Sequence, residues 1–276
     1  VEMERKMQDI FVKLFNEGIA DQMAPLEALA LFYEYRNFTP PGPAGVQMVE
    51  KLSDRLIGVD LLSAAAQLLE QQMRTQLEKE ERSRVGTKLA RIYLKNNQPK
   101  RAMQALQESV YGENPILMRI QRNQIAAEAM MRLDKPDEAL STLGQDDSPQ
   151  AEKIRSMIYW SQRDWHNVIT SIENMLRRRQ DPSAQLTMEE SSFVLRLALA
   201  YVFENDIAQL QYMRDYFSPL LRDNPNYAAF DYITTPDIEP NTRNFDDLLA
   251  ALAKTRDFVV NYNAAVSVAD AATSNQ

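Results

Sequence analysis

The stretch PKRAMQAL at residues 99–106 is repeated in outline by PDEALSTL at residues 136–143. Each begins with a proline, places an alanine three residues later and a leucine four residues after that. Proline fits the first turn of a helix, where its missing N–H has no partner to lose. The small residue lets a neighbouring helix approach closely, and the large apolar residue one turn later fills the groove between the two helices. Each stretch therefore predicts the second helix of a helical hairpin.

The same spacing recurs along the chain. PLEALALF at residues 25–32 supplies a further copy, and weaker copies occur at Leu61, Ala64, Leu68 and at Trp165, Val168, Ile172. The anchor residues of the copies are Ala28, Ala64, Ala102, Ala139 and Val168. The four alanines are 36, 38 and 37 residues apart, and a near-constant interval of this size indicates an array of hairpins in which each packs on the next.

A first helix is predicted before each second helix. Tyr93, in KLARIYLKN, stands nine residues before Ala102, and Met130 and Tyr159 stand at the same distance from later anchors. Residues 190–217 supply another first helix, but its second helix lacks the small anchor, so we predict a degenerate or capping unit there. Glycine is scarce and β-branched residues seldom alternate. We therefore expect an all-α fold.

This pattern resembles the tetratricopeptide repeat, W-x2-L-G-x2-Y, then A-x3-F, then P. The likeness is strong over residues 84–116, where Pro115 falls near the closing proline position, and partial elsewhere. Ala90 and Ala127 replace the first-helix glycine, and the opening tryptophan is missing throughout. The resemblance implies a right-handed α-α superhelix, a TPR-like solenoid of about five to six hairpins over residues 1–217.

Residues 32–62, FYEYRNFTPPGPAGVQMVEKLSDRLIGVDLL, are similar to a segment of large uncharacterised alphaproteobacterial proteins with such repeats. The shared features are a Tyr-Arg pair before Thr-Pro, two spaced glycines and a Leu-Ser-Asp-Arg-Leu helix, and the resemblance extends over about the first 145 residues. In those proteins the repeats form the carboxyl-terminal part, and several look exported. The resemblance therefore favours the cell envelope or periplasm over the cytoplasm. Because the chain begins with Val1, we expect a fragment or a processed form.

Three segments depart from the hairpin pattern. NFTPPGPAG at residues 37–45 predicts a stiff loop between a helix ending near Arg36 and one beginning near Val46, since proline disfavours helix before it and glycine permits backbone angles closed to other residues. A proline-rich ligand segment for an SH3-like or WW-like domain is the alternative. Residues 218–244, rich in Pro, Asp and Asn, predict a loop. Residues 245–264 predict a capping helix, and residues 265–276 a disordered tail.

Composition excludes several classes of function. The formal net charge of -8 argues against nucleic-acid binding, which needs a surplus of Lys and Arg on one face. The basic run Arg177–Arg179 suits the negative end of a helix dipole, with a binding patch as the alternative. No apolar stretch approaches the roughly 20 residues that span a bilayer, so we expect no direct membrane insertion. The chain has no cysteine and a single histidine, His166, so we expect no metal site.

The sequence offers little material for catalysis. No phosphate-binding glycine loop and no nucleophile elbow occurs. The acid pairs Asp146, Asp147 and Glu189, Glu190 stand among turn residues, where carboxylates are mostly solvated or cap helices. We therefore expect no enzyme and no cofactor.

Stacked hairpins line a concave surface with their first helices, where a peptide or helix of another protein fits. From the outward positions we take Arg91, Lys95, Arg132 and Trp160 as partner-binding candidates, suited to a ligand with an apolar anchor and some acid. Packing between repeats is the alternative for Trp160. The Lys and Asn residues of the clamp that grips a chaperone's carboxylate are not carried over. We thus expect a protein-interaction scaffold.

Two other functions stay open. The repeats could serve as a spacer arm or a self-assembly module, in which case the chain forms a homo-oligomer. They could also recruit substrates for a catalytic part that lies upstream of residue 1.

Overall fold

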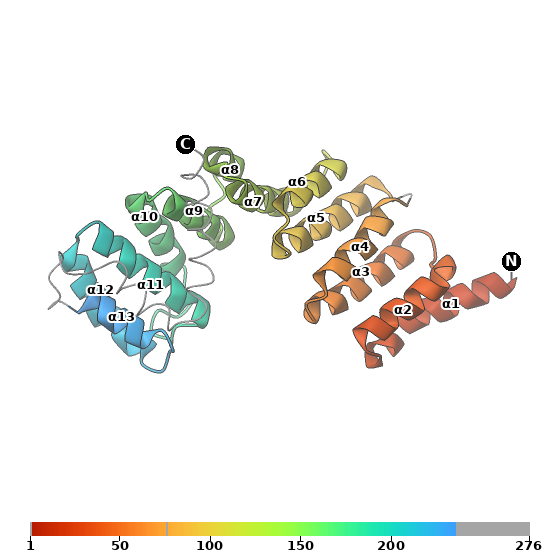
Figure 1. Cartoon of the computed structure of the whole chain (residues 1–276), viewed down its shortest axis with the longest axis horizontal. Coiled ribbons are helices and arrows are strands. Elements are labelled where there is room, and N and C mark those ends of the chain that lie inside the picture. The colour runs from red at the N-terminus through yellow and green to blue at the C-terminus, as the bar shows by residue number, and fades with distance from the viewer. Residues whose placement is uncertain (1, 76, 236–276) are drawn as a thin grey trace, which may run out of the picture. The chain divides into compact units, whose positions relative to one another are not determined.

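The computed structural model describes residues 2–75 and 77–235. Helices α1–α13 and two short 3-10 helices account for the regular structure of this part of the chain, and no strand occurs in it (Figure 1). The all-α prediction is confirmed. The chain divides into two compact units, Val1–Leu143 and Gly144–Gln276.

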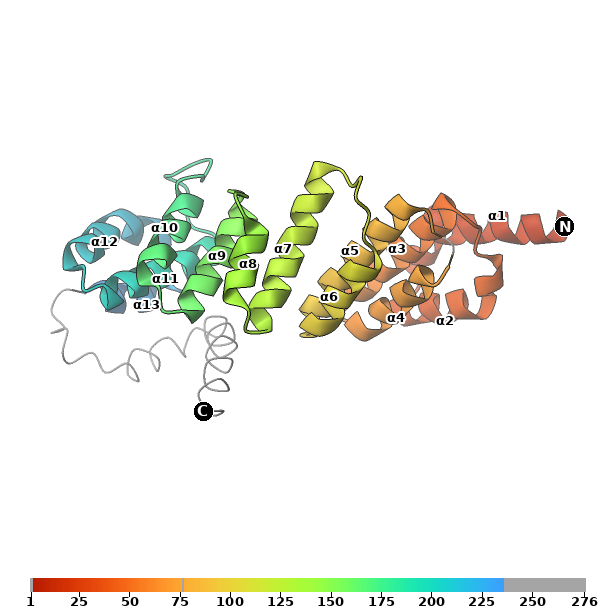
Figure 2. The same cartoon turned by 90° about the horizontal axis from the view of Figure 1, so that it is seen from above.

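The first unit consists of helices that pack in consecutive pairs (Figure 2). Its elements are α1 (Glu2–Asn16), η1 (Ile19–Gln22), α2 (Pro25–Tyr35), η2 (Arg36–Phe38), α3 (Pro43–Gly58), α4 (Leu62–Met73), α5 (Lys79–Lys95), α6 (Pro99–Glu108), α7 (Ile116–Arg132) and α8 (Pro136–Leu143). Within the unit, α3 also contacts α5, and α5 contacts α7. Successive first helices therefore lie beside one another, and one apolar core runs from Phe11 to Ala129.

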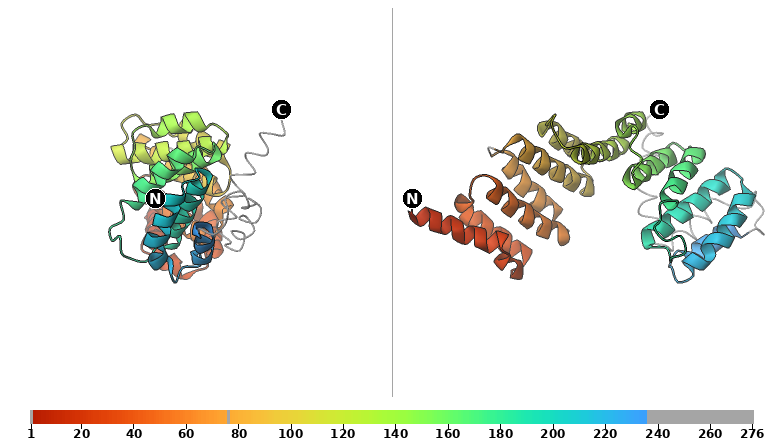
Figure 3. Two further views of the ribbon diagram at one scale, coloured as in Figure 1. Left: turned by 90° about the vertical axis from the view of Figure 1, so that its left-hand side faces the viewer. Right: turned by 180° about the vertical axis from the view of Figure 1, so that it is seen from behind.

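The second unit, described by itself, also consists of helices that pack on their neighbours in sequence (Figure 3). Its elements are α9 (Pro149–Ser161), α10 (Trp165–Leu176), α11 (Met188–Phe203), α12 (Ile207–Leu221) and α13 (Tyr227–Thr234). Helix α11 packs against α10, α12 and α13, and its apolar residues form the centre of the second core.

One turn geometry joins the two helices of five hairpins. The turn residues are Asp60, Asn97, Asp134, Arg163 and Asn205, all left-handed with φ between 52° and 62°. In each turn the next residue donates its N–H to the carbonyl five residues back, as Gln98 does to Tyr93 at 2.7 Å. This pairing satisfies carbonyls that the end of the first helix leaves free. The second helix then begins two residues after the left-handed residue.

The predicted spacing of the second helices is confirmed in α2, α6, α8 and α10. Their anchors and the large residues one turn later are all buried: Ala28 and Phe32, Ala102 and Leu106, Ala139 and Leu143, Val168 and Ile172. In α4 the anchor lies one residue later than predicted, at Ala65, because the turn at Asp60 starts the helix at Leu62. The anchors Ala28, Ala65, Ala102 and Ala139 then follow at a constant interval of 37 residues.

The first helices share a small residue that lies 12 residues before the second-helix anchor. These residues are Ser53, Ala90, Ala127, Ser156 and Ala198, and none exposes any surface. A larger side chain there would hold the partner helix away. Gly86 adds a closer approach in α5, since a Cβ at this position would lie 2.1 Å from the Ser109 Oγ at the end of α6.

The segment at residues 37–45 is shorter as a loop than the sequence predicts. Gly42 is left-handed with φ 76°, as the loop requires, but Pro43 already opens α3 three residues before the expected start. Gly45 lies in the first helical turn, where a Cβ would be 2.1 Å from the Pro40 carbonyl oxygen. This glycine thus serves a close backbone approach rather than a turn.

The prediction of a loop over residues 218–244 is wrong in part. Helix α12 extends to Leu221 with Pro219 inside it, and α13 buries Phe230 and Ile233. Asn226 at the start of α13 donates to Ser191 Oγ at 2.8 Å, so an Asn that reads as a loop residue instead fixes a helix start. The predicted helix over 245–264 and the tail over 265–276 lie outside the described residues.

Candidate functional site

The four predicted binding residues belong to different units. Arg91 and Lys95 lie on α5 and Arg132 at the end of α7, all in the first unit, whereas Trp160 lies on α9 in the second. The candidates therefore form two surfaces, each of which is described by itself.

In the first unit, ion pairs join neighbouring first helices. Arg84 Nε lies 3.1 Å from Glu50 Oε1, and Lys88 Nζ lies 2.8 Å from Asp54 Oδ1, so α5 is paired with α3. Lys95 lies 3.8 Å from Asp60, and both are exposed. Exposed pairs of this kind contribute about 0–1 kcal/mol each. They nevertheless place a carboxylate beside three of the cations of α5.

Arg91 and Arg132 differ in their surroundings. Arg91 is exposed and forms no hydrogen bond or ion pair with another described residue. Arg132 is half-buried, donates to the Leu94 carbonyl at the end of α5 at 2.5 Å, and pairs with Glu128. A cation is favourable at the negative end of a helix. The geometry therefore favours a packing role for Arg132 and leaves Arg91 accessible to a partner.

Trp160 belongs to an aromatic cluster in the second unit, which consists of Trp160, Trp165 and Phe203. The Trp160 and Trp165 rings meet edge to face, with centroids 5.2 Å apart, and Phe203 stacks on Trp165 at 4.4 Å. All three side chains are half-buried. The packing interpretation of Trp160 is therefore supported, while Trp160 and Trp165 each keep part of their surface exposed to solvent.

The guanidinium of Arg196 lies over the Trp160 ring, with Cζ 5.8 Å from the ring centroid. Arg196 is half-buried on α11, and it forms no hydrogen bond or ion pair with any described residue. Burial lowers the pKa of this guanidinium to about 10, so it stays charged at neutral pH. Sequence reasoning missed Arg196, although it is the one charged residue between Ser191 and Phe203 in an otherwise apolar helix.

Other half-buried arginines within the described ranges all donate hydrogen bonds. They are Arg55, Arg82, Arg122, Arg132, Arg155, Arg179 and Arg214. A buried charge without a partner is costly, which is why such pairing is the rule. Arg196 is therefore an exception among the residues that the structure describes.

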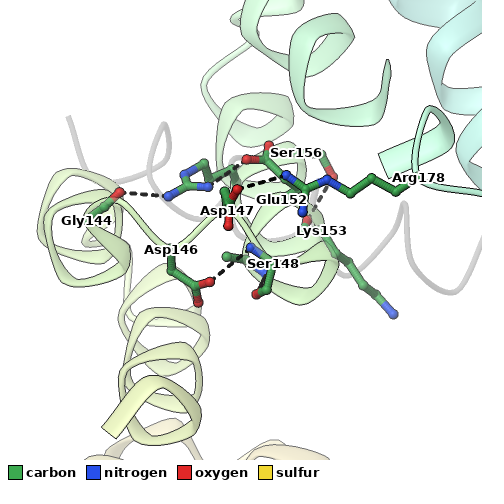
Figure 4. Close-up of polar contacts among 10 residues, drawn as sticks. Gly144, Asp146, Asp147, Ser148, Glu152, Lys153, Ser156 and Arg178 are labelled. Atoms are coloured by element: carbon green, nitrogen blue, oxygen red, sulfur yellow. Dashed lines mark hydrogen bonds and ion pairs between the residues drawn. The ribbon is translucent and has the colours of Figure 1, made fainter. Parts of the chain in front are cut away.

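The basic run Arg177–Arg179 does not form a free patch. Its three side chains pair with different carboxylates, those of Glu173, Asp147 and Glu190. Figure 4 shows Arg178 reaching Asp147 in the segment before α9, at 3.0 Å. These pairs tie the end of α10 to neighbouring segments, so the binding-patch alternative is disfavoured.

The predicted capping role of the acid pairs is confirmed for Glu190, whereas Asp146 closes the turn before the N-cap Ser148. Asp146 accepts the Ser148 N–H at 3.0 Å just before α9 (Figure 4). Glu190 forms a capping box with Thr187 at the start of α11. Burial opposes ionisation of Glu190, yet hydrogen bonds from Thr187 and the guanidinium of Arg179 hold its pKa below the usual value.

A shallow pocket of about 330 Å³ lies where the chain passes from α6 into α7, and Asn114, Arg119 and Arg122 are among its lining residues. Arg122 is not free to serve a ligand there. It donates to the Leu106 carbonyl at 2.6 Å and to Thr87 Oγ1 at 2.9 Å, so it joins α7 to α5 and α6. Burial lowers the pKa of Arg122 as well.

Other kinds of site have no candidate in the part of the chain that the structure describes. It contains no group of three or more metal-ligating side chains. None of its helices is both long enough and apolar enough to cross a membrane. His166 is exposed at the start of α10, as a surface residue.

The chain matches no protein-family model, and no curated protein is significantly similar to it.

Proposed function

We propose that the chain is a non-catalytic protein-interaction scaffold built from TPR-like hairpins. Within each unit the hairpins stack with a right-handed rotation, and the first helices present a binding face to a peptide or a helix of another protein. The observation that carries the proposal is the turn shared by five hairpins, together with the contacts between successive first helices of the first unit. A constant turn keeps the outward side chains of these helices on one face.

The chemistry of this face supports a peptide ligand. In the first unit the face carries charged side chains, with Arg91 exposed and unpaired among the described residues. In the second it carries the aromatic cluster and Arg196. A ligand with an apolar anchor and acidic groups matches both surfaces, since helical grooves bind such segments through spaced anchors.

Site-specific photo-cross-linking in the cells that make the protein tests the proposal. A photoreactive residue is placed at Arg91 or Ser161, both exposed on first helices, and at the matched positions Gln107 and Thr170, which are exposed on second helices. We expect the same partner protein to be cross-linked from the first-helix positions and not from the second-helix positions. Equal cross-linking from all four positions contradicts the proposal.

A self-assembly function is the second candidate. Tyr212 and Tyr216 on α12 stack with ring centroids 6.0 Å apart, although their side chains are 60% and 40% exposed. Exposed aromatic pairs of this kind favour association. If the cross-links join only copies of the chain, and light scattering shows a dimer that Tyr212→Ser dissociates, this function replaces the first.

A further inference from the structure

We propose that Arg196 and the aromatic cluster form a recognition site for an acidic peptide segment, in which one carboxylate side chain is flanked by apolar residues. The inference rests on the proposed interaction function and names the class of ligand that the second unit takes.

The first step is the unfilled hydrogen-bonding capacity of Arg196. A guanidinium offers five N–H donors and no acceptor. Arg196 is half-buried on α11, yet no oxygen of a described residue accepts from it. The other half-buried arginines are explained by the carbonyls and carboxylates that they bind, such as Leu94 and Glu128 for Arg132. No contact with a described residue explains in this way why Arg196 is half-buried.

The second step is the missing counter-charge. The carboxylates on α9, α10 and α11 are already paired: Glu152 with Arg155, Glu173 with Arg177, Glu189 with Lys153 and Glu190 with Arg179. A carboxylate of a ligand would provide the missing counter-charge for Arg196. The planar fork of arginine matches a carboxylate with two parallel hydrogen bonds, a geometry that a lysine cannot reproduce.

The third step is the support that the aromatic rings give. The Trp160 ring faces the guanidinium, an arrangement that holds the cation through its flat face and leaves the N–H groups at its edge for a ligand. Trp165 extends the apolar surface next to it, and Phe203 stacks on Trp165. An apolar residue beside the acidic one can pack there. The site therefore favours an acidic residue between apolar neighbours over an acidic run.

The chain contains two tryptophans, and both belong to the cluster. Tryptophan fluorescence therefore reports on this site alone. The probes are acetylated and amidated seven-residue peptides with a central Glu, flanked on each side by Leu, Met, Phe or Val and then by Gly and Ser. Each peptide is also made with Gln at the centre. The full chain is titrated with both series.

We expect the Glu peptides to change the fluorescence saturably and the Gln peptides to bind at least tenfold more weakly. Arg196→Gln should abolish this discrimination, and Arg196→Lys should restore only part of it. Arg222→Gln, which changes an exposed arginine in the same unit, should keep it. Circular dichroism and thermal unfolding check that Arg196→Gln folds, and we expect its Tm to equal or exceed that of the native chain.

Three results overturn the inference. The first is equal binding of the Glu and Gln peptides by the native chain. The second is discrimination by Arg196→Gln that equals that of the native chain. The third is that no peptide binds. The photo-cross-linking result then separates the two proposals. If the first-helix positions still cross-link a partner, the scaffold function stands and only this site is wrong; if they do not, both fail.

Discussion

The two units use the same hairpin but differ in how their first helices treat charge. In the first unit, the half-buried arginines of α5 and α7 all donate to backbone carbonyls, as Arg132 does to Leu94. In the second unit, α9 and α11 meet through aromatic rings, and Arg196 has no acceptor among the described residues. This comparison distinguishes two kinds of arginine: those whose hydrogen bonds join neighbouring helices, and Arg196, which forms no such bond with a described residue. An arginine without a structural hydrogen bond, such as Arg196, is the better candidate for a binding function.

The units also differ in regularity. The anchors of the first unit follow at 37 residues, whereas Val168 and Leu210, the corresponding residues of α10 and α12, are 42 residues apart. Both intervals keep the same turn, so the extra length falls between hairpins. The turn and the small packing residue are therefore what defines the repeat, and the connecting segments are free to vary.

The largest effect is expected at Gly86 in the first unit. Its counterpart in α11 is Val194 and in α3 is Val49, so among these helices only α5 has a glycine at this position. Gly86→Ala should lower the free energy of unfolding by about 2 kcal/mol, because the added Cβ would clash with Ser109 and push α6 away. Gly58→Ala has open space around the new Cβ and should be neutral or stabilising. Chemical denaturation measures both, and equal stability of the two variants would show that close approach does not fix α5 against α6.

The contrast between the arginines can be tested directly. Arg132→Met should cost about 1–2 kcal/mol of unfolding free energy, because it leaves the Leu94 carbonyl and Glu128 without their partner. Arg196→Met should cost nothing or stabilise, because it removes a half-buried charge that lacks an acceptor. Urea unfolding of the two variants gives the comparison. A loss at Arg196 as large as that at Arg132 would assign both residues to packing.

One of the two left-handed turns of the second unit, that at Arg163, is less suited to its residue than the turns of the first unit. Arg163 holds φ 58°, whereas the first unit uses Asp or Asn at this position. Arg163→Gly should raise the free energy of unfolding by about 1 kcal/mol, because glycine adopts this conformation without steric cost. Asn97→Gly, the control, should change it less, since Asn tolerates the left-handed region. Equal changes in Tm would mean that the turn stores no strain at Arg163.

The smallest effect is expected for the loss of stability at low pH that depends on Glu190. The folded-state pKa of Glu190 is held below its usual value, so its stabilising contribution is present above the ordinary glutamate pKa and is lost as pH falls through the folded value. We expect a loss of less than about 1 kcal/mol for this partly exposed group. Glu190→Gln should lose less stability than the native chain between neutral pH and about pH 3. The free energy of unfolding of both proteins is measured as a function of pH. Identical slopes would show that Glu190 does not contribute to the loss of stability in acid.

The sequence by itself determined the hairpins. The Pro, Ala and Leu spacing located α6 and α8, and the same register located α2 and α10, because the faces of a helix are set by its own periodicity and turns by local backbone preferences. The predicted anchor Ala64 lies one residue before the observed anchor, Ala65, because two adjacent alanines fit the pattern equally well. Sequence reasoning also missed α13, because turn residues at its start masked an eight-residue helix.

Only the tertiary structure decided which charges are free. Arg132 and Arg196 both read as cations on first helices, yet one reaches a carbonyl of the preceding first helix, α5, and the other reaches no acceptor within the described residues. Whether a charge finds a partner depends on the helices that lie next to it. The partner can be distant in sequence: Leu94 is 38 residues from Arg132. The pattern along a helix is local and readable, whereas the pairing of its outward side chains is a property of the packed array.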